Sequence, residues 1–257
     1  MMDQMPPVAW QVIWPALLHL FVMSVIASLA GPVIGMMWTV FFAGMVTSFI
    51  LYPLYRRRMR ENGRPFGHTW RVRMNPAASW LFIAVMAAAA CLLLNHLIAL
   101  CGMMGFSKGY EEAAGGIYSV PIWIQMLVTG AAAPVAEELV FRGMGYACLR
   151  TRMGTAPAAV ISALFFGLYH GNLVQAVYAF GLGIMLAVIY EHFDGLPSAV
   201  FFHVAANVAA VVLTALAGRF SLLFENQLFT VVQILVCVLI LTAAFIRIYS
   251  GDRRDRR

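Results

Sequence analysis

Long apolar stretches fill most of this sequence, and they constrain its fold more than any other feature. A helix needs about 20 apolar residues to cross the hydrocarbon core of a bilayer, where every backbone polar group must bond within the protein. Hydrophobic residues make up 62% of the 257 positions and charged residues 11%, whereas soluble domains carry about 25% charged residues. We therefore predict an all-α fold, a polytopic integral membrane helical bundle, with residues 1–257 forming a single domain.

The apolar stretches predict about eight transmembrane helices. The fourth stretch is too long for one straight crossing, so it should tilt or extend past the bilayer, with Pro134 as a candidate kink. Before it, a segment containing Lys108, Glu111 and Glu112 is expected to form a small polar loop. The expected spans are residues 8–29, 33–55, 77–101, 117–149, 156–169, 173–190, 197–217 and 228–249.

Basic residues are distributed unevenly over this predicted topology. Eight crossings put both termini on one side, and 14 of the 17 basic residues fall on that side, in an arginine-rich loop (56–73), at Arg150 and Arg152, and near the C-terminus. Basic loops remain in the cytoplasm, so we expect a multi-pass protein of the cell membrane with cytoplasmic N- and C-termini. The net charge of +6 then reflects topology and contact with the lipid bilayer, and no nucleic acid partner is expected.

Two adjacent acids lie inside the fourth apolar stretch. Glu137 and Glu138 are the only acidic residues within a long apolar segment, and ionisable groups in such positions usually serve a function. On a helix, Glu138 and Arg142 share a face at i and i+4 and can form a structural ion pair. Glu137 is rotated from Glu138 by about 100°, which leaves it for chemistry. The alternative is that all three residues form one structural salt-bridge cluster.

Polar side chains also occur in two later stretches. His170 ends the short fifth stretch, and His203 and Asn207 share one helical face at i and i+4. At about 1.5 Å per residue, Glu137, His170 and His203 can all lie between the cytoplasmic surface and the middle of the bilayer. We therefore expect one polar cavity that faces the cytoplasm and holds all three.

These side chains suit the activation of a water molecule beside a carbonyl group. Glu137 would take a proton from the water with help from His170, while His203 and Asn207 would donate hydrogen bonds to the developing oxyanion. A zinc site with Glu137, His170 and His203 as ligands and an open fourth position is the other interpretation. The HExxH spacing is absent, which weakens it. Zinc is thus a candidate cofactor to which the residues do not commit the protein.

Three short motifs stand in order on successive predicted helices: Glu137-Glu138-x-x-x-Arg142, Phe166-x-x-x-His170 and His203-x-x-x-Asn207. Together they resemble the motifs of the CPBP family, which groups CAAX prenyl endopeptidases with bacteriocin-processing and abortive-infection proteins. The resemblance covers about residues 121–212 and implies an eight-helix intramembrane endopeptidase with its catalytic core at about 117–217. It also implies a catalytic glutamate at Glu137, catalytic histidines at His170 and His203, and an oxyanion-binding Asn207. A metal-free mechanism is slightly favoured over a zinc-dependent one.

The first hypothesis is therefore an enzyme that hydrolyses a peptide bond of a protein or peptide at the membrane. The alternative is a non-catalytic peptide-binding membrane chaperone or bacteriocin immunity protein that uses the same cavity. A proton-coupled transporter with Glu137 and the histidines as a relay ranks last, because transporters of that kind are built from inverted repeats and the sequence has no convincing repeat.

Overall fold

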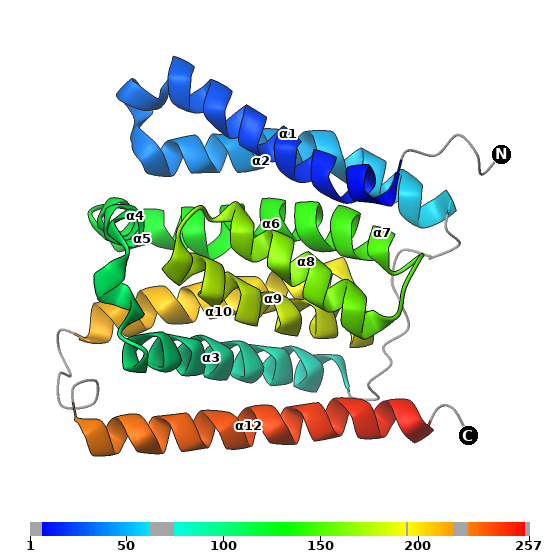
Figure 1. Ribbon diagram of the computed structural model, residues 1–257, viewed down its shortest axis with the longest axis vertical. Helices are drawn as coiled ribbons and strands as arrows, with labels where there is room; N and C mark the ends of the chain where they lie inside the picture. Colours follow the sequence, from blue (N-terminus) through cyan, green and yellow to red (C-terminus); the bar gives the residue numbers. More distant parts are fainter. Residues whose placement is uncertain (1–6, 62–74, 194, 218–225, 255–257) are drawn as a thin grey trace.

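The computed structural model describes residues 7–61, 75–193, 195–217 and 226–254, and the regular structure within these ranges is helical throughout (Figure 1). Seven helices are long and apolar enough to cross a membrane, and the shorter apolar α8 (Thr155–Tyr169) makes a further passage. The predicted all-α bundle of about eight membrane helices is confirmed. The long helices are α1 (Val8–Leu29), α2 (Gly31–Glu61), α3 (Pro76–Leu100), a compound helix over Ile122–Leu149, α9 (Leu173–His192), α10 (Leu196–Ala217) and α12 (Gln227–Arg254).

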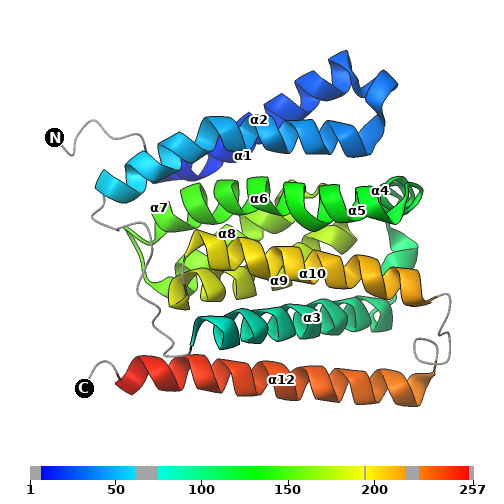
Figure 2. The same cartoon turned by 180° about the vertical axis from the view of Figure 1, so that it is seen from behind.

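The helices form layers, and the motif-bearing helices lie in the middle. In both views α1 and α2 run along one side of the bundle, α3 and α12 run along the other, and the compound helix, α8, α9 and α10 lie between them (Figures 1 and 2). The described N- and C-terminal helix ends point to the same end of the bundle, which we call the terminal end. The middle layer is therefore shielded on both sides.

Helix α4 (Lys108–Tyr118) corrects one of the sequence predictions. Its residues were expected to form a polar loop and the start of the fourth span, but they form a separate helix that lies across the bundle at the end opposite the termini (Figure 1). We call this end the α4 end. The Ser107 side chain caps α4 by accepting a hydrogen bond from the Tyr110 amide. Pro121 then disfavours helical geometry at the residue before it, so the crossing helix begins afresh at Ile122.

The compound helix contains two π-helical segments on its way through the bundle. It consists of α5 (Ile122–Leu127), a π-helix η2 (Val128–Ala132), α6 (Ala133–Glu138), a second π-helix η3 (Leu139–Tyr146) and α7 (Ala147–Leu149). The sequence predicted a kink at Pro134, and the irregularity that the structure has there is the π-helix just ahead of the proline. Wider π-turns rotate the side chains that follow and occur often at functional sites, and here they flank the two glutamates.

Helices α8 and α9 form a tight hairpin that carries the second motif. Gly171 turns the chain between them with φ +72°, a backbone conformation that glycine adopts without a steric penalty. The Asn172 side chain then caps α9 by accepting a hydrogen bond from the Gln175 amide at 3.0 Å, and such caps stabilise a helix by about 1 kcal/mol. The turn stops short of the ends of α3 and α10 (Figures 1 and 2).

Small residues let the two helices of the hairpin pack closely. A Cβ atom on Gly167 would come within 2.7 Å of the Ala176 carbonyl oxygen, and one on Gly183 within 2.9 Å of the Ala163 Cβ. Neither contact is tolerable, so these positions require glycine. Small residues of this kind are typical of helix contacts in membranes.

The arginine-rich segment after the second span is partly helical. α2 extends to Glu61, beyond the predicted end near Tyr55, and carries Arg56, Arg57, Arg58 and Arg60 in its last turns. Other basic residues of the sequence lie outside the described residues: Arg64, Arg71, Arg73, Arg219, Arg256 and Arg257.

Candidate active site

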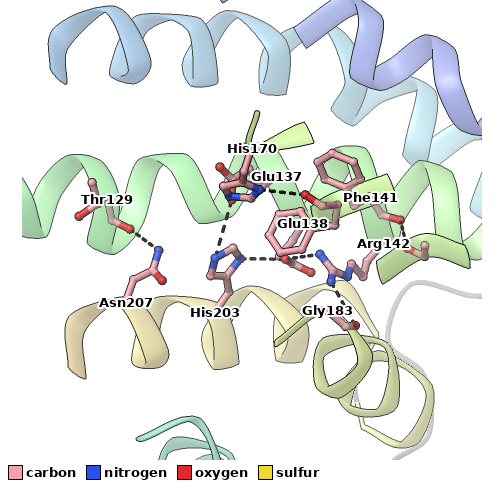
Figure 3. Close-up of polar contacts among 11 residues, drawn as sticks. Thr129, Glu137, Glu138, Phe141, Arg142, His170, Gly183, His203 and Asn207 are labelled. Carbon is pink, nitrogen blue, oxygen red and sulfur yellow. Dashed lines mark hydrogen bonds and ion pairs between the residues drawn. The ribbon is translucent and has the colours of Figure 1, made fainter. Parts of the chain in front are cut away.

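A buried ion pair lies beneath the site. Glu138 and Arg142 are both 0% exposed, and Arg142 Nη1 donates to Glu138 Oε1 at 2.9 Å (Figure 3). Arg142 Nη2 donates to the Gly183 carbonyl at 3.2 Å, and the guanidinium lies 4.4 Å from the Phe166 ring centre. A buried pair is tolerable only with such additional partners. The predicted ion pair of Glu138 and Arg142 therefore forms, and Arg142 also links η3 to α8 and α9.

Glu138 has a second partner that sequence spacing does not reveal. His203 Nδ1 lies 2.8 Å from Glu138 Oε1, and since an ionised carboxylate can only accept, Nδ1 is the donor. The opposite ring nitrogen, Nε2, then faces Glu137, with 3.7 Å between it and Glu137 Oε2. That distance exceeds hydrogen-bond range. Glu138 thus orients the imidazole, in the way that a carboxylate orients a catalytic or metal-binding histidine in many enzymes.

His170 is also oriented by a bond through Nδ1. It lies just after α8, and its Nδ1 donates to the Phe166 carbonyl oxygen at 2.8 Å. The other nitrogen, Nε2, is left as the side that can accept a proton. The Phe166 ring meets both imidazoles edge to face, with centroid distances of 5.0 Å to His170 and 5.7 Å to His203. Phe166 therefore separates the two histidines and holds each at a fixed angle.

Asn207 connects α10 to the first π-turn. Its Nδ2 donates to the Thr129 carbonyl oxygen at 2.8 Å (Figure 3), which engages a backbone acceptor in the π-helical segment. An amide group carries two N–H donors, and this bond uses one of them. Asn207 lies one helical turn from His203, on the face that lines the cavity.

The four predicted catalytic residues share one cavity. It has a volume of about 470 Å³, and Glu137, His170, His203 and Asn207 all line it, within the range of about 300–1,000 Å³ that is usual for ligand sites. The Glu137 side chain is 15% exposed whereas that of Glu138 is 0% exposed. Two adjacent residues of one type therefore have different environments, and only Glu137 is accessible to a bound molecule.

The cavity lies on the side of the bundle away from the termini. Most of its lining residues come from the α4 half of each helix or the border of that half, such as Asn95 and Ile98 near the end of α3. Helix α4 itself contributes Tyr110, Ala114 and Tyr118. The sequence-based picture put both the termini and the cavity on the cytoplasmic side. In the structure the cavity extends from Glu137 and His203, which lie in the terminal halves of their helices, towards the α4 end.

The zinc interpretation does not fit the positions of the donor groups. Zinc would need its ligand atoms at about 2.0–2.2 Å from one point. Among the residues that the structure describes, no three His, Cys, Asp or Glu side chains are grouped so that they could hold a metal ion. We therefore derive no step through a metal.

Sequence reasoning missed a contribution from α1. His19 is 3% exposed, its Nδ1 lies 2.8 Å from Thr47 Oγ1, and its ring stacks on Tyr169 at 5.7 Å between centroids. Tyr169 lines the cavity beside His170. Helix α1 thus supports the cavity wall, although no motif in its sequence indicates this.

Comparison with known proteins concerns the middle of the chain. Residues 119–209 match the family described as "Type II CAAX prenyl endopeptidase Rce1-like". The "Putative membrane peptidase YdiL" of Bacillus subtilis (strain 168) is 26% identical over 107 residues, which are 42% of this chain and 43% of that protein. The match therefore spans less than half of either protein. No solved structure matches the chain.

Proposed function

We propose that this chain, which belongs to the CPBP family of intramembrane proteases by its residues 119–209, hydrolyses a peptide bond of a membrane-associated protein or peptide with water activated by Glu137. One observation carries the proposal. Glu137 is the accessible acid of the pair, and it faces the Nε2 atom of a histidine whose other nitrogen is held by the inaccessible acid. An idle structural cluster would not need this division between the two glutamates.

In the proposed reaction, the Glu137 carboxylate accepts a proton from water while the water oxygen bonds to the scissile carbonyl carbon. The carbonyl π electrons move to oxygen, and the resulting oxyanion accepts hydrogen bonds from His203 Nε2–H and Asn207 Nδ2–H. His203 serves in its doubly protonated form, since Nδ1–H is already given to Glu138. Glu137 then returns the proton to the nitrogen of the leaving amine as the C–N bond breaks.

His170 completes the set by accepting a hydrogen bond from the same water at Nε2. Its Nδ1 bond to the Phe166 carbonyl keeps the acceptor nitrogen toward the cavity. Proton transfer by a positioned side chain typically contributes about 100- to 10,000-fold in rate, and one oxyanion donor about 100- to 1,000-fold. This mechanism uses only groups of the chain, and insensitivity of cleavage to chelators together with metal-free purified protein would support it.

The surrounding architecture supports further parts of the proposal. We place the catalytic core at about residues 117–217 within one integral membrane domain, in the cell membrane, with both termini cytoplasmic. The charge distribution supports this orientation, because nine of the eleven described basic residues lie at the terminal end.

The deciding experiment measures cleavage by detergent-purified protein on a library of peptides and candidate membrane substrates. Glu137→Gln should lower kcat by about 100- to 10,000-fold with little change in melting temperature, since the group is a partly exposed proton acceptor. Glu112→Gln on the exposed face of α4 is the matched acid-to-amide control and should cleave normally. Full activity of Glu137→Gln would remove the mechanism. Peptide binding without turnover in the unmodified protein would favour the chaperone or immunity function.

A further inference from the structure

Helix α4 and the turn of the α8–α9 hairpin meet at the α4 end of the site. Fifteen residues of α8 span about 22 Å at 1.5 Å per residue, less than the hydrocarbon thickness of about 30 Å. Helix α4 lies over the hairpin turn, where a Cβ atom on Gly109 would be 3.3 Å from the Asn172 Cβ. Helix α4 thus contacts the hairpin turn at Gly109, and its Tyr110, Ala114 and Tyr118 line the cavity beyond that contact.

The other end of the site is closed. All eight residues of η3 are buried, and the Glu138–Arg142 pair and Phe166 form a layer directly below the cavity, each at most 1% exposed. This layer separates Glu137 from the terminal end. A substrate therefore reaches Glu137 from the α4 end.

The charges of the two ends differ. On α4 itself, the described acids Glu111 and Glu112 outnumber the single base Lys108. Nine of the eleven described basic residues lie at the terminal end, in the last turns of α2, just after α7 and in the last part of α12. Since basic segments are retained in the cytoplasm, the α4 end faces the extracytoplasmic side.

The cavity walls restrict what can enter. Among its described lining residues, Glu137 is the only acidic, lysine or arginine side chain. Part of the cavity wall is apolar and formed by Met23, Met36 and Met37. Methionine side chains are flexible, so this part of the wall can adapt to different bound groups. An acidic side chain next to the scissile bond would lose its hydration and meet the like charge of Glu137.

From these observations we infer that the site takes an extended, apolar peptide segment without acidic side chains, presented from the extracytoplasmic side of the membrane. That the bound segment is a substrate rests on the proposed function. The side of the membrane from which the cavity is reached is inferred from geometry and charge alone. A cytoplasmic substrate would have to pass the buried layer around Arg142.

The first test measures sidedness without turnover. In a background with Cys91, Cys101, Cys148 and Cys237 replaced by serine, single cysteines are labelled with a membrane-impermeant maleimide in intact cells and after permeabilisation. Ala210→Cys reports the cavity, and Val212→Cys, two residues along and exposed on the outer surface, is its lipid-facing control. Glu112→Cys and Arg152→Cys report the two ends.

In intact cells, Glu112→Cys and Ala210→Cys should label and Arg152→Cys should not. Val212→Cys should remain unlabelled in both conditions, since maleimides react with thiolates in water. Labelling of Ala210→Cys only after permeabilisation, or in neither condition, overturns the inference. So does labelling of Arg152→Cys from outside.

The second test measures substrate class in sealed right-side-out vesicles. An apolar peptide added outside should be cleaved, and an aspartate beside its scissile bond should lower kcat/KM at least about tenfold, since a like charge near Glu137 and lost hydration both oppose it. Equal cleavage of both peptides overturns the substrate class. Correct labelling with no cleavage of any peptide would instead refute the peptidase function and leave the sidedness intact.

Discussion

Among the described residues, the acidic side chains at the terminal end of the middle layer and those at the cavity are held differently. At the terminal end, Arg150 makes two bonds to Glu191, at 2.9 and 3.0 Å, and Tyr146 donates to the same carboxylate at 2.9 Å. Bonding to Glu191 raises the pKa of the Arg150 guanidinium, so this group keeps its positive charge. In the cavity, the polar contact of Glu137 within the described ranges is one of 3.7 Å to His203 Nε2.

The difference shows which charges hold the fold and which are available for chemistry. A carboxylate with several short bonds has its lone pairs committed, and a reacting molecule would have to break those bonds. A carboxylate with a long contact and an open face can exchange that contact for water or substrate. Glu138 is closer to the first class although it directly follows Glu137 in the chain, since its Oε1 accepts bonds from both Arg142 and His203 and its Oε2 is buried out of reach of a bound molecule.

The largest expected effect comes from breaking the committed pair. Arg142→Met should cost about 3–5 kcal/mol of unfolding free energy, because it leaves the Glu138 carboxylate buried without its cation. Thermal unfolding in detergent measures this. The double variant Glu138→Leu/Arg142→Met should recover much of the loss, since no isolated charge remains. Arg57→Met, at an exposed pair, is the control, and an equal loss there would contradict the assignment.

Removal of an oxyanion donor should be next in size. Asn207→Ala should lower kcat by about 100- to 1,000-fold. Asn95→Ala is the matched control, because Asn95 lines the same cavity and its amide bonds a backbone carbonyl in the same way, that of Cys91. Steady-state kinetics on both variants separate kcat from KM. A similar kcat for the two would show that Asn207 only fastens α10 to η2.

The cluster at the terminal end should show the opposite profile. Glu191→Gln should lower the unfolding free energy by about 1–3 kcal/mol, because Arg150 and Tyr146 each lose a charged acceptor. Cleavage by the folded fraction should be unchanged, since no residue of that cluster lines the cavity. A change in kcat with normal stability would break the comparison between the two clusters.

The smallest effects should come from two glycines. Gly183→Ala should cost about 1–3 kcal/mol, since the new Cβ would meet Ala163 at 2.9 Å and Arg142 Nη2 at 3.1 Å. Gly115→Ala on α4 has nothing within 4 Å of its new Cβ and should add about 0.4–1 kcal/mol by restricting the unfolded chain. Opposite shifts in melting temperature are expected. Shifts of the same sign would contradict the contrast between tight and open packing.

The sequence by itself determined much of this protein. The apolar stretches set the number and approximate limits of the helices, because bilayer thickness fixes a length that can be counted. Helical periodicity put Glu138 and Arg142 on one face, and the three motifs marked Glu137, His170, His203 and Asn207 as the candidates. Each of these conclusions depends only on residues close together in the chain or on their kind.

Only the tertiary structure decided how those parts meet. A membrane span that is apolar on every side gives no sign of how far it is rotated about its axis or at what depth each residue lies. The bond between Glu138 and His203, 65 positions apart, depends on both. So does the extent of the cavity towards the α4 end, where α4 lies across the bundle. Helix rotation, depth and tilt are set by packing between segments, and that packing is read only from the folded chain.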